Sequence, residues 1–305
     1  MEIHDVDCES FEDCISKFKY VGFQATHVGL ALDIIKEMRE DEETTIYFGF
    51  TANLIASGLR GIVAEWVKRK YVDVIVTTGG ALDHDLIKAY MPYLLGSFYD
   101  NDVDLHSKGI NRIGNILVPN DRYVLFEEKM QSIFSDIVDN YGNQVSPSEI
   151  AKEMGKHIND DNSFLMWAYK NNIPVFSPGI TDSALGLQTY FFKQKVKEFS
   201  IDVTKDMKRL ADITLNADKT GAVILGGGIS KHHIIGANIV RGGLDYAVYI
   251  TTAQPWDGSL SGARSNDAVS WGKIKGKARH VTIDGDATIV FPLIHLATKS
   301  IERRR

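Results

Sequence analysis

The segment TTIYFGF (residues 44–50) decides the fold class, because it is a short run of β-branched and aromatic residues that the amphipathic stretch 58–70 follows. Similar apolar runs recur at 72–78, 173–177, 222–225 and 246–252, with helical patterns between them, among them 85–95, 184–198 and 232–240. Apolar strands that alternate with amphipathic helices are typical of βαβ units and a parallel sheet covered on both faces. The sequence therefore predicts an α/β, doubly wound, mostly parallel fold.

The composition is that of an ordinary globular protein. The 305 residues are 44% hydrophobic and 24% charged, with 26 Gly and 7 Pro, which excludes disordered, collagen-like and coiled-coil chains. There is no repeat and no Pro/Gly/Ser-rich linker, so we expect residues 1–305 to form a single domain, with residues 1–21 as an appendage. Segment 96–123 shows no clear helical or strand period, which indicates either a long functional loop or a mistaken assignment. Ser146, Pro147 and Glu149 predict a capped helix over residues 147–157.

Charge and hydropathy limit the partners. The formal net charge of -6, with interspersed charges, argues against nucleic-acid binding. No targeting segment and no run of about 20 apolar residues is present, so we expect a cytoplasmic protein with no membrane partner. Cys8 and Cys14 match neither a zinc-ligand nor a redox pattern and are expected to be reduced. The basic end, Arg303, Arg304 and Arg305, is expected to be a solvated tail.

Small and hydroxyl-bearing residues follow four of the predicted strands. These turns are TTGGALDHD (77–85), SPGITDSALG (177–186), LGGGISKHH (225–233) and TTAQPWDGSLSGA (251–263). Open α/β sheets bind ligands at the carboxyl ends of their strands, where glycines let backbone N–H groups approach a phosphate. Together the turns predict a nucleotide or dinucleotide site. Since none matches a G-x-G-x-x-G or Walker pattern, the alternative is that the glycines only make tight turns.

Charged side chains in the same turns are candidates for chemistry. Carboxylates there could hold ribose hydroxyls or cationic amines, and a histidine could move protons near neutral pH. The acids are Asp83, Asp85, Asp182 and Asp257, and the histidines are His84 and His232. The alternative for His232, which precedes His233, is an ordinary helix-start residue. The His and Asp spacings match no standard metal site, and no metal is expected.

Lys273 is the best nucleophile candidate, because no Ser or Cys lies in a recognisable triad or elbow. It belongs to DAVSWGKIKGK (267–277), where Trp271 precedes it by two residues. An aromatic neighbour that desolvates a lysine lowers the pKa of its amine and frees the amine for imine chemistry. The alternative is a solvated lysine-rich face.

Six segments resemble the deoxyhypusine synthase family, in the family's order and over nearly the whole chain. They are GFQATHVG (22–29), FTANLIASGLR (50–60), GINRIGNILVPNDRY (109–123), IPVFSPGITD (173–182), LGGGISKHHIIGANIVRGGLDYAVYITTAQPWDGS (225–259) and AVSWGKI (268–274). The resemblance implies an NAD-dependent transferase that moves the 4-aminobutyl group of spermidine to one lysine of the precursor of translation factor 5A. The group travels as an imine on an enzyme lysine, which matches Lys273, and His232 matches the active-site histidine.

The resemblance also assigns binding residues and partners. The implied NAD contacts are Ala52, Asn53, Leu54, Ile55, Ala56, Thr78, Gly79, Gly80, Asp182, Gly227, Thr252, Ala253, Asp257, Asp286 and Ala287. The implied amine-binding residues are Asp83, His84, Tyr249, Gly258, Ser259, Asp267 and Trp271. The family is homotetrameric, with active sites at subunit interfaces, so the resemblance implies a homotetramer here. The amino-terminal segment of the family can cover a neighbour's site, and the resemblance implies this role for residues 1–21.

The chain departs from the better-known eukaryotic members at positions that hold the amine. Two acidic positions read Leu187 and Leu260, a glutamate pair reads Asp83-His84, and a further glutamate reads Asp267. An unpaired ammonium in a dry pocket costs several kcal/mol. Either prokaryotic members use a different pocket pattern, or the donor is another amine. Two alternative functions stay open: transfer to putrescine, as in homospermidine synthase, and a catalytically weak NAD-binding paralogue that acts as a regulatory subunit.

Overall fold

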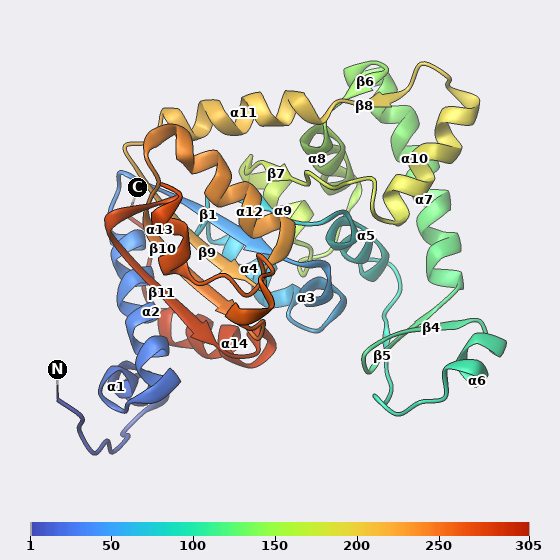
Figure 1. Cartoon of the computed structure of the whole chain (residues 1–305). Helices are drawn as coiled ribbons and strands as arrows, with labels where there is room; N and C mark the ends of the chain where they lie inside the picture. Colours follow the sequence, from blue (N-terminus) through green and yellow to red (C-terminus); the bar gives the residue numbers. More distant parts are fainter. Residues whose placement is uncertain (1, 305) are drawn as a thin grey trace. The chain divides into compact units, whose positions relative to one another are not determined.

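The computed structural model describes residues 2–304 and divides into two compact units (Figure 1). Unit 1 comprises the described residues of Met1–Phe50, Arg69–Val76 and Met207–Arg305, and unit 2 comprises Thr51–Lys68 and Thr77–Asp206. The units interleave along the sequence, so the chain crosses from one to the other several times. The expectation of a single domain over the whole chain stays a prediction.

Unit 1 is built on parallel strands in the order β11-β10-β9-β1-β2, and β7 (Val175–Phe176) belongs to unit 2. The strands of unit 1 are β1 (Thr44–Phe50), β2 (Val74–Val76), β9 (Lys219–Leu225), β10 (Leu244–Thr251) and β11 (Ile274–Asp284). Its helices are α1 (Phe11–Lys17), α2 (Phe23–Glu40), α12 (Gly228–Ala237), α13 (Ser265–Ser270) and α14 (Ala287–Thr298), and α11 (Val203–Leu215) begins at the end of unit 2. The predicted α/β, mostly parallel fold is confirmed.

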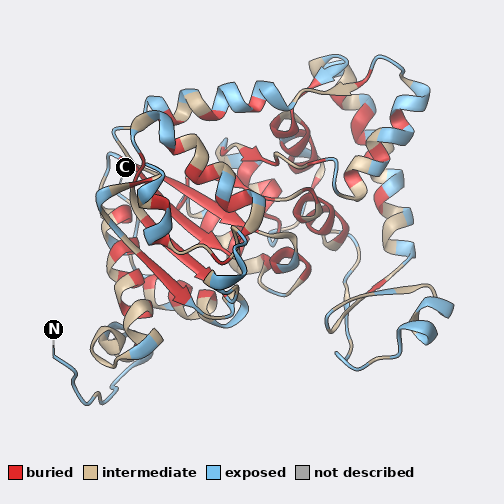
Figure 2. Ribbon diagram, in the orientation of Figure 1, coloured by how far each residue is buried: buried red, intermediate tan, exposed pale blue. Residues whose placement is uncertain are grey.

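Two glycines of the sheet show which helix covers which face. A Cβ on Gly49 of β1 would lie 2.8 Å from Ile234 Cδ1 of α12, whereas a Cβ on Gly221 of β9 would meet the Met38 side chain of α2. Gly221 pairs with Ile46, three residues before Gly49, so the two glycines face opposite sides. Helices thus cover both faces, which explains why β1, β9 and β10 are mostly buried (Figure 2).

The two ends of the chain differ from expectation. Cys8 and Cys14 are joined by a disulfide, so the prediction of free thiols is wrong. The bond links Cys14 of α1 to a residue six positions earlier. Arg303 is not part of a solvated tail, because its guanidinium donates to both carboxylate oxygens of Asp73 at 2.7 and 2.5 Å. Its side chain is 7% exposed. Arg304 is exposed, and Arg305 lies outside the described residues.

Unit 2 is mostly helical. Its helices are α3 (Ala52–Ala56), α4 (Arg60–Lys68), α5 (Gly79–Lys88), α6 (Asp102–Ser107), α7 (Asp121–Tyr141), α8 (Pro147–His157), α9 (Phe164–Asn171) and α10 (Ala184–Lys195). Strands β3 (Leu94–Leu95), β5 (Ile116–Pro119) and β4 (Ile110–Ile113) form a small antiparallel sheet, and β6 (Gln144–Val145) pairs with β8 (Ser200–Ile201). The predicted capping box at Ser146 and Glu149 is confirmed at the start of α8.

One expectation for unit 2 is wrong, and one open alternative is decided. The helix expected over residues 85–95 ends at Lys88, and Leu94–Leu95 forms β3, because Pro92 cannot continue a helix. Segment 96–123 is not one long loop, because it contains α6, β4 and β5 and the start of α7. These elements are too short to show a period in the sequence. No helix within residues 2–304 combines the length and apolar character needed to cross a bilayer.

Candidate active site

Most residues expected to bind the amine lie together in one pocket of unit 1, with a volume of about 360 Å³. The pocket lies between α12, the end of β10, the loop that follows it, and α13. Its lining residues are Lys231, His232, Ile235, Tyr249, Gly258, Ser259, Leu260, Ala263, Arg264, Asp267, Ala268, Trp271 and Lys273. The set contains both predicted catalytic residues, so the structure brings together side chains that are 41 positions apart.

Lys273 lies at the turn between α13 and β11. Its backbone N–H donates to the Ala268 carbonyl at 2.9 Å, and its own carbonyl accepts from Leu244 N–H at 3.0 Å. Gly272 has φ +66°, a conformation that a glycine adopts without strain and that turns the chain back into the pocket. Lys273 Nζ lies 5.2 Å from the centre of the Trp271 ring. The predicted lysine–tryptophan neighbourhood is therefore present, although Trp271 is itself 71% exposed.

His232 lies on α12 and lines the same pocket. Partial burial, together with the positive charge of Lys273, lowers the pKa of His232 below its usual 6.5. The imidazole is therefore neutral near pH 7 and can accept a proton. The pKa of the neighbouring His233 is also lowered, mainly by burial and then by His232.

Tyr249 contributes a buried hydroxyl. Its Oη has no hydrogen-bond partner within residues 2–304, and burial raises the pKa of the phenol, so it stays protonated. A buried hydroxyl without a partner costs free energy, which a ligand atom would recover. Tyr249 is thus a ready donor or acceptor for a bound amine.

Two cationic residues of the pocket were not predicted from the sequence. Lys231 is 1% exposed, and its Nζ donates to the carbonyls of Ala263 at 2.9 Å and Ser261 at 3.3 Å. Arg264 donates to the Ala253 carbonyl at 3.2 Å and forms an ion pair with Asp284. Nothing in the local sequence distinguishes these cations from surface residues, because their burial depends on a loop that folds back from another strand.

The candidate carboxylates have different environments. Asp257 is exposed, and a hydrogen bond from Ser259 lowers its pKa, so it is ionised. Asp267 accepts from the Arg264 N–H at 3.0 Å and caps α13. Asp182 is exposed after β7. Of these three carboxylates, Asp267 alone is among the residues that line the pocket. Leu260, where the eukaryotic members have an acid, contributes an apolar side chain to the same lining.

Asp83 and His84 are committed to contacts within unit 2. Asp83 accepts from the N–H groups of Ala184 and Leu185 at 2.8 and 3.0 Å, at the start of α10, and burial raises its pKa to about 7. His84 Nδ1 lies 2.8 Å from Tyr93 Oη, and burial lowers its pKa to about 4. Their expected contact with an amine stays a prediction. Leu187 is 53% exposed on α10.

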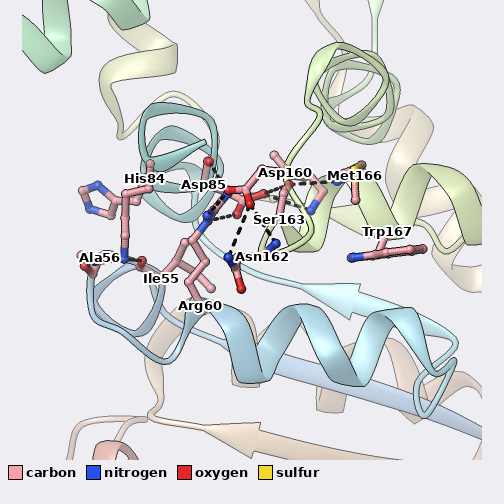
Figure 3. Close-up of polar contacts among 12 residues, drawn as sticks. Ile55, Ala56, Arg60, His84, Asp85, Asp160, Asn162, Ser163, Met166 and Trp167 are labelled. Atoms are coloured by element: carbon pink, nitrogen blue, oxygen red, sulfur yellow. Dashed lines mark hydrogen bonds and ion pairs between the residues drawn. The ribbon is translucent and has the colours of Figure 1, made fainter. Parts of the chain in front are cut away.

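Asp85 is part of a buried polar cluster of unit 2 (Figure 3). It accepts from Arg60 Nε at 2.6 Å, Ser163 Oγ at 2.6 Å and Leu165 N–H at 3.0 Å. Arg60 also donates to Asp160 at 2.5 Å. Both carboxylate oxygens of Asp85 accept hydrogen bonds from residues of unit 2. Asp85 therefore holds α4, α5 and the start of α9 together.

The expected NAD residues of unit 1 gather at the carboxyl edge of the sheet. Leu225 pairs with Phe50 and Ile250, and Thr251 pairs with Asp284, so the strands end at one level. The segments that follow hold Gly227, Thr252, Ala253, Asp257, Asp286 and Ala287. A Cβ on Gly227 would lie 2.5 Å from Ser261 Cα, so only glycine fits there.

The expected NAD residues of unit 2 lie on α3, at the start of α5 and after β7. Thr78 precedes α5, and Gly79 and Gly80 form its first turn. A Cβ on Gly80 would lie 3.1 Å from Ala52 Cβ of α3. Thr78 Oγ1 is buried and has no hydrogen-bond partner in the described chain. An unsatisfied hydroxyl beside the N-terminus of a helix fits the phosphate and ribose groups of a dinucleotide.

Lys88 binds the C-terminal end of α3. Its Nζ donates to the carbonyls of Ile55, Ala56 and Ser57 at 2.9, 2.9 and 2.5 Å. These carbonyls belong to the helix C-terminus, where a cation is favourable. Burial, with a smaller effect of Arg60, lowers the pKa of Lys88 to about 8. No cluster of three or more His, Cys, Asp or Glu side chains among the described residues is placed to hold a metal ion.

Comparisons with known proteins agree with the segment resemblance. The family model "Deoxyhypusine synthase" matches residues 13–298. A probable deoxyhypusine synthase of Pyrococcus furiosus is 47% identical over 94% of this chain and 90% of that protein, and one of Schizosaccharomyces pombe is 42% identical over 94% and 86%. The crystal structure of a putative deoxyhypusine synthase from Entamoeba histolytica superposes with a TM-score of 0.70 at 26% identity, over 97% of this chain and 95% of that one. The chain belongs to the deoxyhypusine synthase family.

Proposed function

We propose that the protein catalyses NAD-dependent transfer of the 4-aminobutyl group of spermidine to a lysine of the precursor of translation factor 5A. The observation that carries the proposal is the presence of Lys273 and His232 in one pocket, together with the unpartnered Tyr249 hydroxyl. Family membership supports the reaction class. The residues expected to hold NAD are those of α3, the start of α5 and the carboxyl edge of the sheet.

When bound, NAD would supply a hydride acceptor for the donor amine and, later in the cycle, the hydride for the product. Neutral His232 accepts the proton that the reacting amine nitrogen must release. Lys273 Nζ then attacks the oxidised carbon, the bond from that carbon to nitrogen breaks, and 1,3-diaminopropane leaves with a proton. The aminobutyl group remains on Lys273 as an imine until the acceptor lysine displaces it. Exclusion of water matters at this stage, because water would hydrolyse the imine.

We further propose a homotetramer in a cytoplasmic setting, as in the family. Exposed apolar side chains support self-association, among them Leu95, Phe98 and Tyr99 of unit 2 and Trp256 of unit 1, because a monomer rarely leaves such groups in water. Residues 1–21 would contact a neighbouring subunit. Analytical ultracentrifugation tests the stoichiometry, and a monomer at micromolar concentration would contradict it.

One experiment tests the reaction. The protein is incubated with NAD and spermidine labelled in the aminobutyl part, with and without the acceptor protein, and trapped with borohydride. Label on Lys273 without acceptor, and on the acceptor when it is added, is the expected result. Lys273→Arg cannot form the imine at neutral pH and should carry no label, whereas Lys277→Arg, at an exposed position, should behave like the wild type.

A second candidate is transfer to putrescine, which would use the same pocket and the same Lys273 imine and differ only in the acceptor. Adding putrescine in place of the acceptor protein separates the two reactions. Release of labelled homospermidine, with no label on the acceptor protein, would favour the second candidate. Absence of label on wild-type Lys273 would reject both and leave an NAD-binding paralogue.

A further inference from the structure

Lys231 is a buried cation that the proposed reaction does not use. It lies on α12, directly before His232, and its ammonium reaches across to the loop that follows β10. The Nζ donates to the Ala263 carbonyl at 2.9 Å and to the Ser261 carbonyl at 3.3 Å. It also lies 5.1 Å from the centre of the Tyr249 ring. Lys231 therefore contacts three parts of the pocket wall.

The loop that Lys231 holds carries Gly258, Ser259 and Leu260 into the pocket. The Ser261 carbonyl also accepts from Thr251 Oγ1 at 3.4 Å, and Ser261 packs against Gly227 at the start of α12. Outside these contacts the loop has an exposed course, with Trp256, Asp257 and Ser259 in solvent. Loss of the ammonium would remove two of the hydrogen bonds that join the loop to α12.

The charge of Lys231 adds to a wall that is already positive. The charged and titratable groups facing it are Arg264 before α13, Asp267 on α13, Tyr249 on β10, His232 on α12 and Lys273 before β11. Asp267 is the one carboxylate among the described lining residues. Burial, followed by the repulsion of Arg264, lowers the pKa of Lys231 to about 8, so it is largely charged at neutral pH.

We propose that Lys231 is a positioning residue of the amine pocket, which fixes the loop 258–263 against α12 and whose charge favours an uncharged amine nitrogen at the reacting position. The proposal rests on the proposed function for its second half. An ammonium has no lone pair and cannot lose a hydride to become an imine, whereas a neutral amine can. A positive wall lowers the pKa of a bound amine, so the pocket would select the reactive form at the expense of affinity for the cation.

Lys231→Met and Lys231→Arg test the two halves, with Lys277→Met as the exposed control. Amide hydrogen exchange of residues 258–263 needs no substrate and so is independent of the reaction. We expect faster exchange in Lys231→Met, and wild-type exchange in Lys231→Arg and in the control. Unchanged exchange in Lys231→Met, or equal loss in Lys231→Arg, would refute the positioning role.

The charge is tested by the pH profile of kcat for the donor amine, because kcat reports groups in the enzyme–substrate complex. Each profile is measured in a His232→Gln background, so that titration of this histidine does not contribute. Loosening the loop should lower kcat of Lys231→Met by about 10²-fold, because misplacement by 1 Å has that effect. Removal of the positive charge should also move the acid limb to higher pH, and Lys231→Arg should leave the limb in place. An acid limb at the same pH with and without Lys231→Met would refute the charge effect even where the loop has loosened.

Discussion

Arg60 and Asp85 form an ion pair that is almost completely inside unit 2, with Arg60 Nε 2.6 Å from Asp85 Oδ1 and side-chain exposures of 6% and 0% (Figure 3). Removing one partner leaves the other charge buried without compensation, which costs about 3–5 kcal/mol. We therefore expect Arg60→Met to lower the free energy of unfolding by about that amount in urea titrations. Lys208→Met removes an exposed pair on α11 and should cost at most about 0.5 kcal/mol. Equal losses of unfolding free energy in the two variants would show that the buried pair stabilises the protein no more than the exposed pair does.

His232→Gln tests the proton acceptor. The amide cannot take up a proton, so we expect kcat to fall by about 10²–10⁴-fold, the usual contribution of a general base. The lowered pKa of His232 also predicts that the wild-type rate persists to below pH 6.5 before protonation removes it. His233→Gln, a neighbour outside the pocket lining, serves as the matched variant. A pH-rate profile of His232→Gln that keeps the wild-type acid limb would assign that limb to another group.

His84 should make stability fall in acid. The unfolded chain takes up a proton near pH 6.5, but burial keeps the folded imidazole neutral down to about pH 4. Over that window the unfolded state binds more protons, so the free energy of unfolding decreases as the pH is lowered. His84→Gln keeps a polar partner for Tyr93 without titrating and should reduce this decrease. Urea midpoints at pH 4.5, 5.5 and 7 measure the effect, with the exposed His106→Gln as control; parallel slopes for all three proteins would contradict it.

The contact between Arg303 and Asp73 should stabilise unit 1. Arg303 also donates to the Thr44 carbonyl at 2.8 Å, and Asp73 accepts from Ile46 N–H at 2.8 Å. Arg303→Met therefore leaves a carboxylate and a carbonyl short of donors, and we expect a loss of about 1–3 kcal/mol. Arg304→Met removes an exposed neighbour and should change little. Thermal unfolding of the two variants makes the comparison, and equal melting temperatures would show that the tail is dispensable.

The strands, the helix cap and the turns after the strands depend on short stretches of sequence and could be predicted from them. The apolar runs located β1, β2, β7, β9 and β10 but not β11 (Ile274–Asp284), and the Ser146–Glu149 capping box located the start of α8. The turns that follow β9 and β10 were predicted to converge, because the carboxyl ends of parallel strands meet at one edge. The position of Lys273 beside Trp271 was likewise suggested by two residues that are close in sequence.

Contacts between distant segments could not be predicted in this way. Whether Lys231 is buried depends on Ala263, 32 residues away, and whether Arg303 is buried depends on Asp73, 230 residues away. Segment 96–123 shows no period in the sequence because its two strands span only four residues each. The commitment of Asp83 to the start of α10 depends on a contact 101 residues along the chain.

The interleaving of the two units has a consequence for synthesis on the ribosome. Strand β1 pairs with β9 in a register that matches Thr44 with Lys219, so the middle of the sheet in unit 1 stays open until the later part of the chain has been made. Strand β1 is apolar and has no β9 partner at that stage, whereas all segments of unit 2, which end at Asp206, have already been made. Pairings of such long sequence separation form slowly, and exposed strands are prone to aggregation meanwhile. We therefore expect β1 on nascent chains to lack its β9 partner until residues 219–225 have been made, so that unit 1 completes its folding after unit 2.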